Sequence, residues 1–189
     1  MMLSSSQSIL CKIVEAASDL IDHVVLSICP DPPDVTINPR QLSKRNDWLA
    51  RYEAISDLNV ITARRLSEIN QDYPTKDRMP SCGFFIDSVK EAPSPGGEES
   101  FVGSMGCIVL VEGETFSRSL RELYEIQHAI RSILMLDKSL GHITHLGGLI
   151  DHIRWDNFTE PIMDIEEMRN PFISATWFYE IHFREHIYR

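Results

Sequence analysis

The stretch from Thr115 to Leu136 constrains the fold most strongly, because its apolar residues recur at the spacing of an α-helix. One broad stripe carries Phe116, Leu120, Leu123, Ile126, Ile130, Ile133 and Leu134. Charged residues such as Arg118, Glu122 and Glu125 fall on the opposite side. The pattern predicts an organising helix whose apolar side needs a sheet or a second helix to cover it.

Two further helices are predicted near the N-terminus. Residues Ser8 to Ile28 repeat the amphipathic pattern, and Cys29-Pro30 ends it. Prolines from 30 to 39 predict an extended connector, because each fixes its own φ and biases its predecessor away from helix. From Ser43 a short helix is predicted to direct four side chains inward: Trp48, Leu49, Tyr52 and Ile55.

Strand composition appears in several segments. The run from Leu58 to Ala63 predicts a first strand, and 83–91 with 101–111 predicts a hairpin whose tip, 92–100, is too long for a tight turn. The Pro, Gly and Glu content of this tip predicts a mobile projecting arm. Gly103 and Gly106 indicate a bulge or a close approach of neighbouring groups.

The last two strands follow the organising helix. Residues 149–158 predict one strand, and the closing segment alternates apolar and polar residues from Ile173 to Arg184, which indicates one core face and one outward face. Trp177 and Tyr179 are predicted to line the core, and Trp155 is predicted to be a core or interface anchor. The order of elements predicts a single α+β domain over residues 1–189, in which helices pack on one face of an antiparallel sheet. Residues 1–56 form its helical N-terminal part, and 57–189 form the sheet and central helix.

Composition excludes several classes of function. Eighteen basic and 28 acidic residues give a formal charge of −10, which opposes wrapping of a nucleic-acid backbone as the primary task. No apolar run approaches the ~20 residues of a transmembrane helix, and the first residues lack the basic start of a signal peptide, so we expect a soluble protein that stays inside the cell that makes it. The four scattered cysteines are expected to be reduced thiols.

Three of the histidines form the only compact histidine cluster in the sequence. His142, His145 and His152 could bind a metal ion, and His142-Ile143-Thr144 matches half of a two-motif phosphoesterase signature. No second His-x-Thr motif exists, and the flanking glycines favour a turn with solvated histidines. His182 is expected to face solvent or a subunit interface. We therefore predict no catalytic, metal or cofactor site, and we interpret the acidic run Asp164, Glu166 and Glu167 as a solvated surface rather than a cation site.

The order of elements, with a strand entering at Asp57-Leu58-Asn59-Val60, resembles that of tail terminator proteins of long-tailed bacteriophages. The resemblance covers roughly Asp57 to the end and is most specific where Pro161-Ile162-Met163-Asp164 leads through an acidic stretch into the final strand, Phe172 to Trp177. Residues Pro30 to Ser56 depart from the compact plan of that family.

The resemblance implies a non-enzymatic virion protein of the neck, assembled in the host cytoplasm. Such proteins form a ring, commonly of six subunits, that caps the tail tube, stops its polymerisation and meets the head connector, while DNA passes without specific binding. The expected contact surfaces are the hairpin tip and the acidic segment, with Pro93, Pro95, Glu98, Glu99, Asp164, Glu166 and Glu167. The alternatives are another neck, head-completion or baseplate component, a host-directed binding module, and a metal- or His-dependent phosphoesterase.

Overall fold

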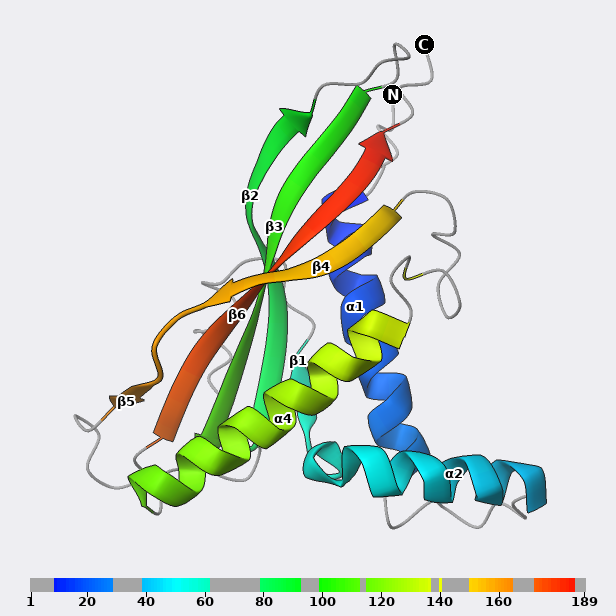
Figure 1. Ribbon diagram of the computed structural model, residues 1–189, viewed down its shortest axis with the longest axis vertical. Helices are drawn as coiled ribbons and strands as arrows, with labels where there is room; N and C mark the ends of the chain where they lie inside the picture. The colour runs from blue at the N-terminus through cyan, green and yellow to red at the C-terminus, as the bar shows by residue number, and fades with distance from the viewer. Residues whose placement is uncertain are drawn as a thin grey trace, which may run out of the picture.

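A six-stranded sheet with helices on one face forms the core of the protein (Figure 1). The computed structural model describes residues 9–28, 39–61, 79–92, 99–112, 115–136, 140, 150–164 and 172–185. In chain order the elements are α1 (Ile9–Ile28), α2 (Pro39–Tyr52), the 3-10 turn η1 (Glu53–Ile55), β1 (Asn59–Ile61), β2 (Ser81–Ala92), β3 (Glu99–Glu112), α4 (Phe116–Leu136), β4 (Ile150–Phe158), β5 (Ile162–Asp164) and β6 (Phe172–Glu185). The prediction of an α+β fold is confirmed.

The C-terminal strand β6 lies inside the sheet. The strand order is β1-β2-β3-β6-β4, and β5 also pairs with β6. The ladder between β3 and β6 extends from Glu99 opposite Glu185 to Glu112 opposite Phe172. The pairs β2–β3, β3–β6, β4–β6 and β5–β6 are antiparallel, as predicted. The prediction is wrong for β1, which pairs with β2 in parallel because the chain between Ile61 and Ser81 is long enough to return to the same end of the sheet.

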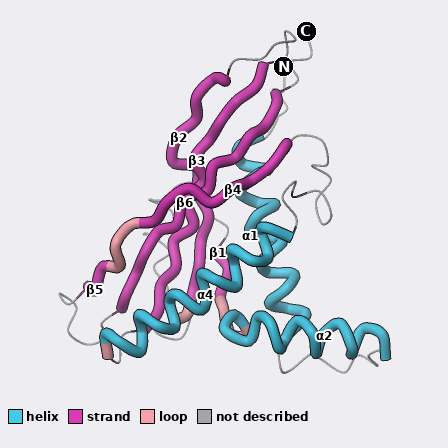
Figure 2. Tube along the Cα trace, in the orientation of Figure 1, coloured by secondary structure: helices cyan, strands magenta, loops and turns pink. Residues whose placement is uncertain are grey.

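Helices α1 and α4 cover the face of the sheet toward which alternate residues of β6 point. Helix α4 contacts β3, β4 and β6, and α1 contacts β1, β2 and α4 (Figures 1 and 2). The inward residues of β6 are all at most 3% exposed: Ile173, Ala175, Trp177, Tyr179, Ile181 and Phe183. The predicted core positions of Trp177 and Tyr179 are therefore confirmed.

The apolar stripe of α4 is buried from Leu123 onward. Leu123, Ile126, Ile130, Ile133 and Leu134 are buried and Leu120 packs against the core, as expected for the organising helix. Phe116 departs from the prediction, because it is 48% exposed. At this end a polar contact attaches the helix, since the Ser119 hydroxyl donates a hydrogen bond of 2.8 Å to the carbonyl of Glu112 at the end of β3.

Helix α2 starts earlier than the sequence predicted. Its first residue is Pro39 rather than Ser43, which is compatible with proline because the first helical N–H has no partner within the helix. Tyr52 and Ile55 are buried as predicted. The inward prediction is wrong for Leu49, because its neighbour Trp48 occupies the side facing α1, while Leu49 is 36% exposed.

Gly103 and Gly106 of β3 allow neighbouring side chains to approach closely, which confirms one of the two interpretations made from the sequence. A Cβ atom on Gly106 would lie 2.3 Å from the Phe85 ring, and one on Gly103 would lie 3.1 Å from the Ile181 side chain. The bulge lies on the partner strand, where Asp87 interrupts the pairing between β2 and β3. Residues 93–98 of the predicted arm lie outside the described residues, so its projection stays a prediction.

Truncation of Leu123 to Ala tests the packing of α4. We expect the free energy of unfolding to fall by about 2 to 5 kcal/mol, because the change removes fully buried methyl groups and leaves a cavity. Leu136→Ala is the matched control: the same substitution at a 69% exposed position of the same helix should cost about 0.5 kcal/mol or less. Urea denaturation measures both, and equal losses would contradict this assignment of the core.

Candidate functional site

The structure places the described residues of the two predicted contact surfaces, Glu99 and Asp164, near opposite ends of β6. Glu99 pairs with Glu185 at one end, and Asp164 of β5 pairs with Phe172 at the other. At the rise of an extended strand these positions are roughly 40 Å apart along β6. The other five residues of the predicted contact surfaces lie outside the described residues: Pro93, Pro95, Glu98, Glu166 and Glu167. Glu99 and Asp164 therefore do not lie on one contiguous surface.

The histidine pair found in the structure differs from the predicted cluster. His152 on β4 stacks on His182 on β6, with ring centroids 4.1 Å apart and an interplanar angle of 17°. His142 and His145 lie outside the described residues. Within the part of the chain that the structure describes, no group of three or more potential metal ligands comes together. The His152–His182 pair could not be found from sequence, because it depends on the register between two strands far apart in the chain.

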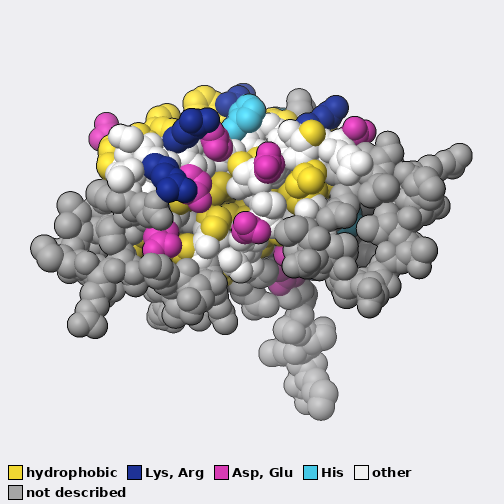
Figure 3. All heavy atoms as spheres, turned by 90° about the horizontal axis from the view of Figure 1, so that it is seen from below, with side chains coloured by type: hydrophobic (Ala, Val, Ile, Leu, Met, Phe, Trp, Pro, Cys, Tyr) yellow, Lys and Arg dark blue, Asp and Glu magenta, His cyan; other side chains and the backbone are white. Residues whose placement is uncertain are grey.

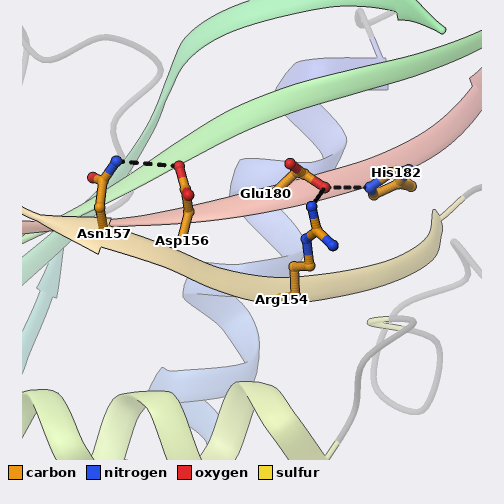
Figure 4. A network of polar contacts seen from close by, with 5 residues as sticks. All are labelled: Arg154, Asp156, Asn157, Glu180 and His182. Carbon is orange, nitrogen blue, oxygen red and sulfur yellow. Dashed lines mark hydrogen bonds and ion pairs between the residues drawn. The ribbon is translucent and has the colours of Figure 1, made fainter.

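His182 belongs to a polar network on the face of the sheet away from the helices (Figure 4). Glu180 accepts a hydrogen bond of 2.6 Å from His182 Nε2 and forms an ion pair of 2.7 Å with Arg154. The hydrogen bond from His182, followed by that from Arg154, lowers the pKa of Glu180. Arg184 donates hydrogen bonds of 2.9 and 3.2 Å to Asp151. These contacts join β4 to β6 across the outer face.

Two bulged aspartates border a hollow of about 350 Å³ beside the network. Asp87 is the extra residue of β2 opposite Met105, and Asp156 is the extra residue of β4 opposite Tyr179. Because Met105 pairs with Tyr179, both bulges occur at the same level of the sheet. The hollow is lined by polar side chains together with Val102, Gly103 and Phe178, and none of its lining residues has a buried side-chain polar atom without a hydrogen-bond partner.

An aromatic cluster lies on the other face, along the seam between α4 and the edge strand β4. Phe158 stacks on the buried Trp177 at 6.4 Å, and Tyr124 meets the same ring edge-on at 6.3 Å. The Arg131 guanidinium lies 5.0 Å from the centre of the Trp155 ring. We name Tyr124, Trp155 and Phe158 the aromatic shelf. Their side chains are 40%, 38% and 46% exposed, respectively.

The shelf is exposed because β4 lies at the edge of the sheet. Trp155 pairs with Tyr179 and Phe158 pairs with Trp177, so both point toward the helix-covered side. Helix α4 covers their partners on β6 and leaves much of these two rings uncovered. Trp155 was predicted from sequence as a core or interface anchor. Tyr124 and Phe158 could not be predicted, because their exposure depends on how far α4 extends across the sheet toward β4.

No protein-family model matches this sequence, and no curated protein matches it. Within the described residues, no helix combines the length and apolar character needed to cross a membrane.

The Glu180 contacts predict a loss of stability in acid. A carboxyl group with a lowered pKa in the folded state stabilises that state above its unfolded pKa, about 4.3, and the stabilisation disappears as pH falls through the folded value. Glu180→Gln should therefore reduce stability at neutral pH, and the difference from the wild type should shrink in acid. Arg154→Met removes only the Arg154 contact, the second cause of the lowered Glu180 pKa, and should therefore reduce stability at neutral pH by a smaller amount. Urea denaturation across the acid range measures both, and a difference that grows in acid would contradict the sign.

Proposed function

We propose that this protein is a structural subunit of a long-tailed bacteriophage: the tail terminator, which caps the tail tube, stops its polymerisation and joins the tail to the head connector. The proposal rests on the resemblance in the order of elements. The described elements follow that order, with β1, the β2–β3 pair, α4, β4 and β6 in succession. Phe172 to Trp177, the segment most specific to the resemblance, lies in β6 and contributes buried residues to the core.

The aromatic shelf is the observation that supports an assembly function most directly. Trp, Tyr and Arg are enriched among the residues that dominate binding energy at protein interfaces. Tyr124, Trp155 and Phe158, with Arg131 beside them, provide this composition on a domain that buries its other two tryptophans wholly or partly. Partly exposed aromatic rings along one seam therefore support the proposal that this surface meets another protein.

A ring imposes a geometric demand on such a subunit. Closed rings use head-to-tail contacts, so every subunit must present two different surfaces that fit each other. The formal charge of −10 favours a channel that DNA traverses without binding. Another ring-forming component of the neck, head-completion complex or baseplate would need the same two surfaces. The position of the protein in the particle distinguishes these alternatives.

Deletion of the gene tests the proposal. We expect particles without this protein to accumulate as unjoined heads with tails of uncontrolled length, because nothing ends tube polymerisation. Electron microscopy of lysates gives the tail-length distribution, and a plasmid copy of the wild-type gene is the control that should restore joined particles. Normal joined particles without the protein would sink the proposal, whereas tails of normal length that fail to join heads would favour a head-completion role.

The enzymatic alternative is tested in the same system. A plasmid carrying His142→Ala, His145→Ala and His152→Ala together should restore joined particles if the protein is structural. Loss of particles with this triple variant, while a variant carrying only His152→Ala still restores them, would favour chemistry at residues 142–145.

A further inference from the structure

We propose that the aromatic shelf of one copy docks on a Leu26-centred patch of a second copy, and that this pair of surfaces forms the head-to-tail contact of the ring. The Leu26 patch consists of Asp19, Asp22 and Leu26 on α1 and Asp47 on α2. The inference rests on the proposed ring and adds to it the two surfaces through which the copies meet.

The Leu26 patch combines an exposed apolar side chain with acidic side chains. Leu26 is 66% exposed, and Asp19, Asp22 and Leu26 lie on one side of α1 because they are three, four and seven residues apart. Trp48 of α2 meets His23 of α1 with ring centroids 6.2 Å apart, so α2 lies against α1 near this side, and Asp47 is the residue before Trp48 on α2. Within the described residues, no cation pairs with the three aspartates.

The shelf offers the complementary charge. Arg131 lies over Trp155, and no carboxylate of the described residues pairs with it. By contrast, Arg121 on the same helix is paired with Glu125 at 2.8 Å. Among the described residues, the shelf therefore presents one cation without a carboxylate partner beside three exposed aromatic rings, and the Leu26 patch presents acids without a cation partner around one exposed apolar side chain. Such complementarity favours contact between two copies and disfavours contact between like surfaces.

The two surfaces can be used at the same time. Helices α1 and α2 lie on one side of the subunit, and the C-terminal end of β4 lies on the other (Figure 1). The view in Figure 3 shows hydrophobic side chains reaching the surface between charged side chains of both signs. One copy can therefore donate its shelf to one neighbour and its Leu26 patch to the other, as a heterologous ring requires.

Side-chain docking fits this edge of the sheet better than addition of a strand. The pairing of β4 shifts between Ile150 and His152 and again between Trp155 and Asn157. Bulges of this kind interrupt an exposed edge and prevent another strand from pairing along it. The neighbouring copy is therefore expected to contact the exposed rings and not the free backbone of β4.

Charge reversal tests the pair of surfaces. The deletion strain is complemented with the wild type, Arg131→Glu, Asp22→Arg, or the double variant that exchanges both charges. We expect each single variant to lower the yield of joined particles at least about tenfold, because it places like charges opposite each other, and the double variant to recover most of the loss. Arg121→Glu is the control on the same helix, outside the shelf, and should support a normal yield.

Two results would overturn this inference while leaving the ring intact. Full yield from both single variants would remove the shelf and the patch from the contact. Loss in the single variants without recovery in the double variant would mean that the two surfaces meet other partners and not each other. Thermal denaturation of each purified variant verifies folding, which both exposed positions should tolerate. The proposed function is tested separately: it would be contradicted if the deletion strain without any plasmid copy produced normal joined particles.

Discussion

The packing of α4 against the inward face of β6 is the contact on which the rest of the structure depends. Strand β6 pairs with β3 on one side and with β4 and β5 on the other, so it joins every antiparallel part of the sheet. Burial beneath the helix is complete enough that it raises the pKa of the Tyr179 hydroxyl far above its ordinary value. The same layer raises the pKa of the Cys107 thiol, first through burial and then through Cys82. A dry, closely packed layer of this kind fixes the position of β4, and with it the aromatic shelf.

The parts of the fold that could be predicted are those with a strong local period. One face of α4 and one face of β6 are buried. Apolar residues therefore recur about every 3.6 residues in α4 and every second residue in β6, and both patterns can be recognised in the sequence. The parallel pairing of β1 leaves no comparable pattern in the sequence. The strand Asn59–Ile61 is only three residues long, and its direction relative to β2 depends on the path of the chain between the two strands. The error at Phe116 has a related cause: periodicity shows which side of a helix is apolar, but not where the covering sheet stops.

The candidate site was predicted less completely than the fold. Trp155 could be singled out from sequence as an anchor, whereas the residues around it could not, because Arg131 lies over its ring and Phe158 stacks on Trp177 only through the packing of α4 on an edge strand. His152 and His182 illustrate the same limit, since their stacking requires a register that no local pattern encodes. Glu99 and Asp164, the described residues among the contact surfaces expected from the resemblance, lie near opposite ends of β6, a separation that the sequence alone did not indicate.

The most direct test of the central claim is electron cryo-microscopy of the neck of intact particles. The account predicts a ring of several copies at the head-proximal end of the tail tube, in which the sheet and α4 of each copy fit the density. Density for this protein at the baseplate, a single copy at the neck, or its absence from finished particles would contradict the claim.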